Sequence, residues 1–116
     1  FISYKIEAII DEFKPDIIAM EEVFINKNPL SSLKLSHARG AIMAMIGRSN
    51  IPMEEYAPNK VKKTLVGVGR AEKEQVLHMV NLIMPTAKIK KLDESDALAV
   101  AYTASVYAAH RKLISK

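Results

Sequence analysis

The chain has 116 residues, of which 49% are hydrophobic and 26% are charged, and its formal net charge is +4 at pH 7. This composition suits a globular domain with a buried core and excludes an intrinsically disordered chain. Cysteine is missing from the sequence, which excludes disulfide frameworks, thiolate metal sites and cysteine nucleophiles. No apolar run approaches the roughly 18 residues of a membrane span and no signal peptide opens the chain, so we expect a cytoplasmic protein without membrane contact.

Hydrophobic periodicity predicts helices and strands in alternation along the chain. Apolar residues recur every three or four positions in several segments, whereas two short apolar runs are bounded by turn residues. In chain order, we expect helices over 2–13, 30–46, 58–64, 72–84 and 93–112, and strands over 16–23 and 51–57. Pro15 ends the first helix, and Pro29 and Pro58 suit the first positions of later ones.

The order of these elements predicts a single α/β domain over 1–116. The first strand is apolar on both faces, as a strand of a parallel sheet covered by helices is. Two strands are nevertheless too few for a stable sheet between so many helices. We therefore expect that strands are missing from this sheet, and that the chain, which opens on Phe1 in mid-helix, is a fragment.

Carboxylates gather at the end of the first strand, in the second strand and at the start of the last helix, at Glu21, Glu22, Glu54, Glu55, Asp93, Glu94 and Asp96. Asp93 and Asp96 are three positions apart, so both project from one face of the first helical turn. A carboxylate just after a buried strand lies where α/β folds bind their ligands. If the last helix packs beside this strand, Glu21 converges with Asp93 and Asp96.

Such a cluster indicates a metal site, because converging carboxylates repel one another unless cations bind between them. Oxygen ligands without cysteine favour Mg²⁺ or Mn²⁺ over zinc. Two such ions can activate a water and stabilise the leaving oxygen in phosphodiester hydrolysis. The alternative is structural, since Asp93 can cap the last helix and Asp96 can interact with its dipole. The spacing alone leaves both interpretations open.

A basic region between positions 60 and 73 contains Lys60, Lys62, Lys63, Arg70 and Lys73. Within it, Gly67 and Gly69 allow backbone N–H groups to approach a phosphate, and Lys73 lies in the first turn of the next helix. The region is a candidate surface for a nucleic-acid backbone, and a solvated basic face is the alternative. Phe24 follows Glu21 in a polar loop, where it either packs in the core or stacks on an unpaired base.

Several blocks of the sequence resemble, in order, the RuvC family of Holliday-junction resolvases. The main blocks are IAMEEVFINKN at 18–28, LKLSHARG at 33–40, YAPNKVKKTLVGVGRAEK at 56–73 and DESDALAVA at 93–101. Each block alone is a moderate signal. Together they cover nearly the whole chain and form a strong one.

The resemblance implies an RNase-H-like α/β fold with a mixed sheet flanked by helices. It also implies a homodimeric, structure-specific endodeoxyribonuclease that nicks two strands symmetrically at a four-way junction during DNA recombination and repair. The family uses two Mg²⁺ or Mn²⁺ ions per active site. A RuvA–RuvB branch-migration complex is a further partner that the resemblance implies.

On the same basis, Glu21 matches the family's catalytic glutamate, and Asp93 and Asp96 match its C-terminal acidic pair, all three as metal ligands. The family begins with three strands and a first metal-ligand aspartate in an Asp-Pro-Gly context. This chain begins after them, in the first helix. We therefore expect the 116 residues alone to bind DNA poorly and not to cut it.

The DNA-facing residues follow from the same resemblance. Phe24 falls on the loop aromatic that the family places against bases near the junction centre, and Lys62 and Lys73 match the two basic residues presented to DNA. One alternative is a catalytically inactive fragment that grips branched DNA through Lys62, Arg70 and Lys73. Another is a structural fragment that associates through an exposed sheet edge.

Overall fold

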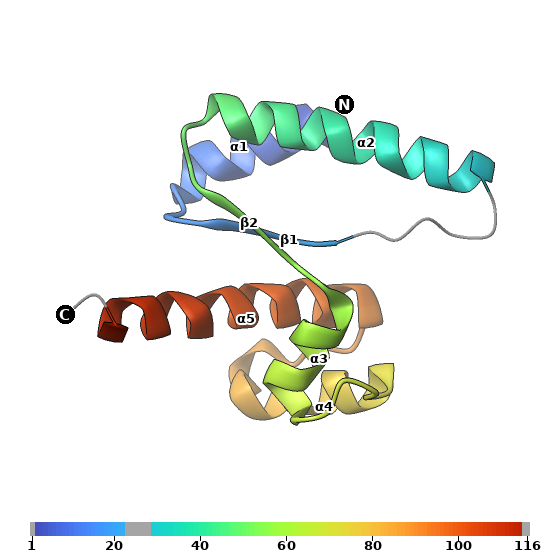
Figure 1. Cartoon of the computed structure of the whole chain (residues 1–116), viewed down its shortest axis with the longest axis vertical. Coiled ribbons are helices and arrows are strands. Elements are labelled where there is room, and N and C mark those ends of the chain that lie inside the picture. The colour runs from blue at the N-terminus through green and yellow to red at the C-terminus, as the bar shows by residue number, and fades with distance from the viewer. Residues whose placement is uncertain (1, 23–28, 115–116) are drawn as a thin grey trace. The chain divides into compact units, whose positions relative to one another are not determined.

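The computed structural model describes residues 2–22 and 29–114 (Figure 1). Its elements are α1 (Ile2–Phe13), β1 (Ile18–Glu21), α2 (Pro29–Arg48), β2 (Met53–Tyr56), α3 (Pro58–Val66), α4 (Lys73–Ile83), the 3-10 turn η1 (Pro85–Ala87) and α5 (Leu92–Ile114). Every helix and strand expected from the hydrophobic pattern is thereby confirmed, with ends that differ by a few residues. Within the described part of the chain, no helix combines the length and apolarity needed to cross a membrane.

The contacts divide the chain into two compact units. The first unit contains α1 and α2, and the second contains β1 from Ala19 onward, the end of β2, and α3, α4, η1 and α5. The single domain over 1–116 stays a prediction.

In the first unit, α1 packs against α2. Among the residues whose burial is described, the buried apolar ones of this pair are Ile10 of α1 and the consecutive Met45 and Ile46 of α2. Lys14 follows α1 in the left-handed conformation, with φ of 46°, and its N–H donates to the Ile10 carbonyl. The left-handed turn and Pro15 after it explain why the helix ends here.

The two strands form a parallel pair. The Ile18 N–H donates to the Pro52 carbonyl at 2.9 Å, and the Glu22 N–H donates to the Tyr56 carbonyl at 2.8 Å. These bonds join positions separated by the same offset in the same chain direction, which is the parallel register. The expectation of a parallel strand at 16–23 is confirmed, and the sheet among the described residues has two strands.

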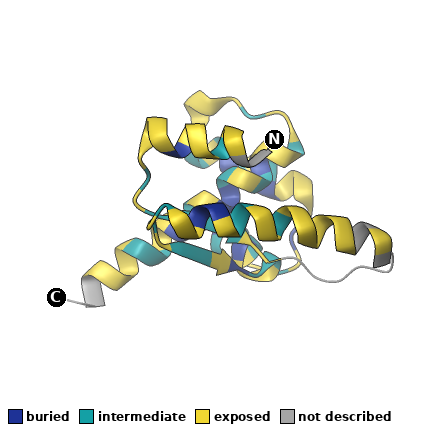
Figure 2. Cartoon of the chain, turned by 90° about the horizontal axis from the view of Figure 1, so that it is seen from above, coloured by how far each residue is buried: buried dark blue, intermediate teal, exposed yellow. Residues whose placement is uncertain are grey.

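The second unit has its core among α3, α4 and α5, which contact one another pairwise. The buried residues of this core are Tyr56, Val61, Leu65, Ala71, Val76, Val80, Ala99, Val100 and Ala104. Along these helices the buried residues recur about every four positions, as the inner face of a helix requires. Figure 2 colours the chain by burial, with the buried residues in dark blue. Small residues on the inner face of α5, such as Ala99 and Ala104, allow the neighbouring helices to approach closely.

The ends of α3 and α4 are fixed by local signals. Pro58 occupies the first turn of α3, and Gly67 ends the helix with φ of 96°, its N–H donating to the Lys63 carbonyl. A positive φ of this size is available to glycine at little cost. At α4, Glu72 and Gln75 form a reciprocal capping box, in which the Glu72 N–H donates to Gln75 Oε1 at 2.7 Å. Both helices therefore begin at defined residues.

Candidate active site

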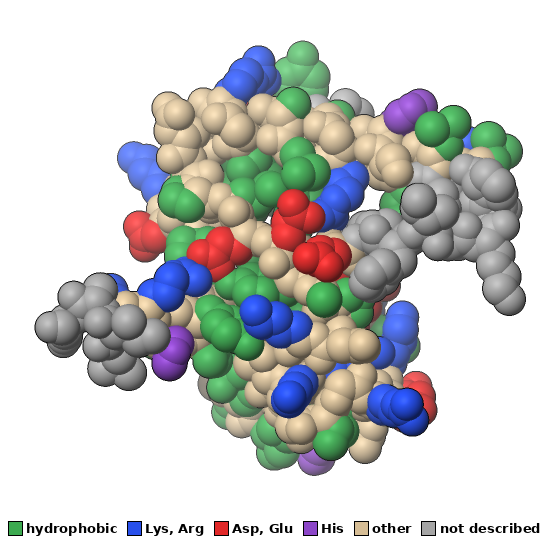
Figure 3. Space-filling view, viewed as in Figure 1, with side chains coloured by type: hydrophobic (Ala, Val, Ile, Leu, Met, Phe, Trp, Pro, Cys, Tyr) green, Lys and Arg blue, Asp and Glu red, His purple; other side chains and the backbone are tan. Residues whose placement is uncertain are grey.

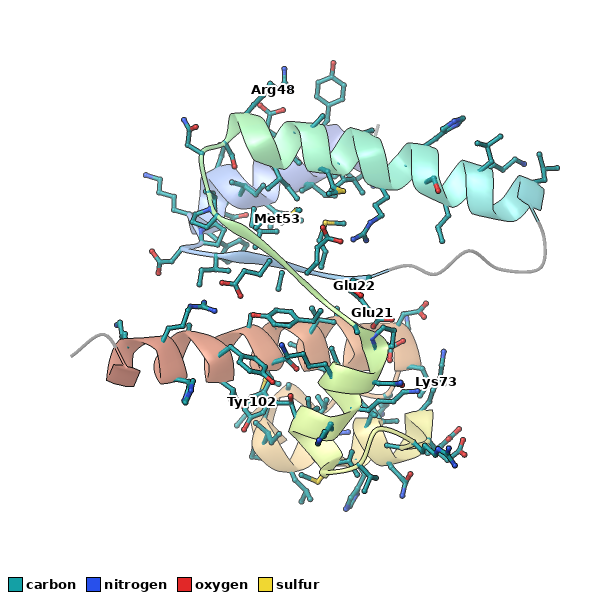
Figure 4. The ribbon with its side chains drawn as sticks, viewed as in Figure 1. Glu21, Glu22, Arg48, Met53, Lys73 and Tyr102 are labelled. Carbon is teal, nitrogen blue, oxygen red and sulfur yellow. The ribbon has the colours of Figure 1, made fainter. Side chains whose placement is uncertain are left out.

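Four charged side chains from four elements line one pocket in the second unit. Glu21 comes from the end of β1, Lys62 from α3, Lys73 from the start of α4 and Asp96 from α5. The hollow has a volume of about 140 Å³, and its remaining lining is Pro58, Val61, Val76 and Ala99. Figure 3 shows acidic side chains close to basic ones on this face. Figure 4 labels the side chains of Glu21, at the end of β1, and Lys73, at the start of α4.

β1 places Glu21 at the pocket through its backbone. The residues before it, from Ile18 to Met20, are half-buried, whereas Glu21 itself is exposed. The next residue, Glu22, is tied by its N–H to the Tyr56 carbonyl. The strand is therefore held in register on both sides of the glutamate, and the carboxylate stands at its carboxyl end, where α/β folds bind ligands.

The helices place the other three charged groups beside buried anchors. Lys62 follows the buried Val61 on α3, and Lys73, the first residue of α4, lies between the capping-box residues Glu72 and Gln75. Asp96 follows the buried Ser95 on α5, and its own side chain is half-buried. Each charged group thus stands at the border between a packed helix face and solvent.

The electrostatics of the pocket centre on Glu21. Burial raises the pKa of its carboxyl above the ordinary value of 4.5, and the negative charge of Asp96 raises it further. Lys62 and Lys73 act in the opposite direction on the same pKa. Because Glu21 is exposed as a residue, solvent screening weakens these effects. Burial and Asp96 together thus outweigh the two lysines in their effect on the pKa of Glu21, and a cation beside the carboxylate would lower this pKa.

A second hollow adjoins the same two carboxylates. It has a volume of about 230 Å³ and is lined by Glu21 and Asp96 together with Ala19, Ala97 and Val100. Glu21 and Asp96 therefore stand between two openings, one with lysines in its wall and one with apolar walls.

The structure brings together some of the residues predicted from the sequence and leaves others apart. Glu21 and Asp96 meet, whereas Asp93 is exposed in the first turn of α5 and lines neither hollow. Across 2–22 and 29–114, no three His, Asp or Glu side chains are grouped closely enough to hold a metal ion. Arg70 is exposed in the loop before α4, outside the lining of both hollows. Phe24 lies outside the described residues.

The position of the two lysines goes beyond the sequence-based prediction. The sequence assigned Lys62 and Lys73 to a DNA-facing surface, and the structure places both in the wall of the carboxylate pocket. The position of Lys62 could have been predicted from the apolar spacing of α3. Val61 and Leu65 mark the buried face of this helix, and Lys62 lies at the edge of that face. Their contact with DNA stays a prediction.

The donor set of the pocket fits a hard divalent cation. Glu21 and Asp96 offer carboxylate oxygens, which Mg²⁺ and Mn²⁺ prefer. Two carboxylates are a partial ligand set, but Mg²⁺ usually keeps several waters and takes further ligands from substrate phosphates. A cation held by these two carboxylates would therefore need water or a substrate phosphate as its remaining ligands.

Comparisons with known proteins agree on one family. Residues 1–104 match the family model described as "Crossover junction endodeoxyribonuclease RuvC". The protein of that name from Orientia tsutsugamushi (strain Boryong) is 62% identical over 105 residues, which cover 90% of this chain and 66% of the relative. The one from Rickettsia felis is 52% identical over 107 residues, covering 91% of this chain and 69% of the relative.

Solved structures of relatives have the same fold. The structure of Thermus thermophilus RuvC has a TM-score of 0.81 at 31% identity, covering 94% of this chain and 66% of that one. T. thermophilus RuvC in complex with Holliday junction substrate has a TM-score of 0.82 at 32% identity, covering 92% and 66%. The RNase-H-like α/β fold expected from the sequence is confirmed. The chain spans 66% of the length of its Orientia relative.

Proposed function

Because the chain belongs to the RuvC family of crossover junction endodeoxyribonucleases, we propose that it supplies the catalytic pocket of an enzyme that nicks four-way DNA junctions. The observation that carries this proposal is the meeting of Glu21 and Asp96 in one pocket with Lys62 and Lys73. Carboxylates serve as ligands for the metal ions of phosphodiester hydrolysis, and ammonium groups bind phosphate. The pocket unites both kinds of group.

Glu21 and Asp96 would hold Mg²⁺ or Mn²⁺, with Asp93, three positions before Asp96 on α5, as a further ligand. When bound, two such ions supply an activated water and charge stabilisation at the leaving 3′ oxygen. The chain's own contribution is to orient the scissile phosphate, because the ammonium groups of Lys62 and Lys73 offset the repulsion between that phosphate and the carboxylates. The apolar residues of the same lining, Pro58, Val61, Val76 and Ala99, leave these four charged groups as the groups that contact the phosphate and the ions.

The substrate and assembly in this proposal follow from the family. Lys62, Lys73 and Arg70 contact the phosphate backbone, and Phe24 stacks on a base near the junction centre. A homodimer provides two pockets for two symmetric nicks in recombination and repair, in the cytoplasm where bacterial DNA lies. A RuvA–RuvB branch-migration complex is the proposed protein partner. The relative solved with a Holliday junction substrate supports the junction as substrate.

One observation favours a second candidate function, a catalytically inactive module that binds branched DNA. Across the described ranges, three potential metal-ligating side chains do not come together, and a two-carboxylate site binds Mg²⁺ weakly. Such a module would grip the junction through Lys62, Arg70 and Lys73 without cutting it.

Cleavage of a labelled, mobile four-way junction with Mg²⁺ or Mn²⁺ distinguishes the two functions. The 116-residue chain is compared with a chain extended to the full length of its relatives. We expect paired symmetric nicks from the extended chain, and their loss in Glu21→Gln with junction affinity retained, since affinity comes mainly from cationic contacts.

Glu22→Gln is the matched control, because it removes the neighbouring carboxylate, which does not line the pocket. Its nicking rate should stay close to that of the unchanged protein. A junction that is bound but never nicked by the extended chain would establish the inactive module. Normal metal-dependent turnover in Glu21→Gln would remove Glu21 from the catalytic machinery.

A further inference from the structure

The side chain of Asn81 on α4 is bonded to the backbone of the segment that leads into α5. Its Nδ2 donates to the Ile89 carbonyl at 2.9 Å, and its Oδ1 accepts from the Ile89 N–H at 2.8 Å. The same Nδ2 also donates to the Leu77 carbonyl, at 3.1 Å, one turn earlier on α4. One amide therefore satisfies both backbone groups of Ile89 and is itself fixed to its own helix.

This contact replaces the support that regular secondary structure would give. Ile89 lies in an extended stretch outside any helix or strand, and its side chain packs against the core of the second unit. The residue before it, Lys88, is held in the left-handed conformation with φ of 50°, which is unfavourable for a lysine. The two bonds to Asn81 hold the chain at the point where this turn must be maintained.

The clamped segment is directly continuous with α5. Leu92, the first residue of α5, follows Ile89 by three positions, and the Ser95 N–H already donates to the Lys91 carbonyl. Asp96 lies in the second turn of this helix and faces the pocket that Glu21 lines from β1. Because a helix moves as a rigid element, a shift of its start changes the separation of the two carboxylates.

We propose that Asn81 is a positioning residue that sets the Asp96 carboxylate opposite Glu21 and thereby determines how tightly the pocket binds a divalent cation. The inference rests on the proposed function, since it concerns the same pocket. Asn81 lines neither hollow, so it acts through the α5 backbone and not on the ion or the DNA. Mutation of a residue that orients a metal ligand typically lowers metal affinity by about tenfold to a hundredfold.

The test compares Asn81→Asp and Asn81→Ala with the unchanged protein, all three in the chain extended to the full length of its relatives. Asn81→Asp keeps the shape of the side chain but loses both N–H donations and places an oxygen against the Ile89 and Leu77 carbonyls. The metal probe is Mn²⁺ alone, titrated by calorimetry and by paramagnetic broadening of backbone amide signals near Asp96. Hydrogen exchange at the Ile89 amide reports whether the clamp has opened.

Thr103→Ala serves as the matched control. Thr103 is buried on α5, and its Oγ1 donates to the Ala99 carbonyl at 2.8 Å, so the variant weakens the same helix without releasing its start. We expect Mn²⁺ affinity to fall about tenfold or more in both Asn81 variants and to stay unchanged in Thr103→Ala. The Mg²⁺ concentration for half-maximal nicking should rise in parallel, while junction affinity without metal is retained.

The outcomes separate this inference from the function on which it rests. Unchanged Mn²⁺ affinity in Asn81 variants whose Ile89 amide exchanges fast would overturn the positioning role and leave the nuclease proposal standing. An equal loss of affinity in Thr103→Ala would also overturn it, because general destabilisation would then explain the effect. If the unchanged protein neither binds Mn²⁺ nor nicks a junction, the proposed function fails first, and the positioning role fails with it.

Discussion

The ammonium nitrogen of Lys60 lies 4.4 Å from the centroid of the Tyr107 ring. The same nitrogen is 5.7 Å from the centroid of Tyr56, and the two rings are stacked with their centroids 5.7 Å apart. Tyr56 ends β2, Lys60 lies in the first turn of α3 and Tyr107 belongs to α5. This cluster joins three elements of the second unit.

We expect Tyr107→Leu to lower the free energy of unfolding by about 1–2 kcal/mol, from the loss of an aromatic pair and a cation–π contact. Lys60→Met keeps the aliphatic stem and should cost about 0.5 kcal/mol. Urea denaturation measures both changes, and Lys63→Met, on the exposed side of the same helix, is the control. Equal losses in the two lysine variants would show that the ring contact contributes no stability.

Ser95 and Thr103 are both fully buried hydroxyl residues on α5, but their hydrogen bonding differs. Thr103 donates to the Ala99 carbonyl, whereas the Ser95 hydroxyl has no hydrogen-bond partner among the described residues. An unsatisfied buried hydroxyl costs free energy, so Ser95→Ala should raise the free energy of unfolding by about 1 kcal/mol and Thr103→Ala should lower it by a similar amount. Thermal or urea unfolding of the two variants decides the sign, and a loss of stability in Ser95→Ala would contradict the prediction.

Lys62→Ala and Lys73→Ala should each weaken junction binding and flatten its salt dependence. A lysine that neutralises a phosphate releases a counterion, so each variant should reduce the slope of log K against log salt by about 0.9. Lys5→Ala removes the same charge from α1, outside the pocket lining, and controls for net charge. Binding titrations at several salt concentrations provide the slopes. If the pocket variants match the Lys5 control, these lysines serve the carboxylates and not the DNA.

Glu21→Gln should change the pH dependence of stability. Because the folded protein raises the pKa of this carboxyl above 4.5, the folded state binds the proton more tightly than the unfolded state does. Ionisation of Glu21 therefore lowers the free energy of unfolding as pH rises from below 4.5 through the raised pKa, and leaves a constant cost at higher pH. Relative to the unchanged protein, Glu21→Gln should become more stable across this window and keep the advantage at neutral pH.

Urea unfolding between about pH 4 and pH 8 measures this difference directly. Glu22→Gln again supplies the control, since it removes a carboxylate one position further along the chain and outside the pocket lining. The same pH-dependent gain in both variants would assign the effect to net charge instead of to the environment of Glu21.

Local signals were sufficient to predict the elements of this fold. Pro15 and Pro58 mark helix boundaries that lie where the sequence placed them, and the carboxylate after the first apolar run, Glu21, stands at the end of β1. These features depend on neighbours in the chain, which is why the sequence alone reveals them.

The pocket itself depends on contacts that the sequence does not encode locally. The sequence pattern does not distinguish Asp93 from Asp96 as a pocket residue. In the structure, Ser95 and Ala99 lie on the buried face of α5, and Asp96, next to this face, lines the pocket. The hydrogen bonds between Asn81 and Ile89 join a polar residue, which by its type would be expected on the surface, to a segment without regular secondary structure. Such a contact carries no periodicity, so it emerged only from the structure.

The hydrogen bond from Glu22 to Tyr56 also has a consequence for the order in which the protein folds. The helices of the second unit are consecutive in the chain, so their core can form by closing short loops. β1 joins that unit only by a long-range closure across all of α2, which costs more conformational entropy and proceeds more slowly. We expect Asp96, Lys62 and Lys73 to be assembled before Glu21 arrives. Local opening of β1 would then remove the glutamate while the helical core stays folded.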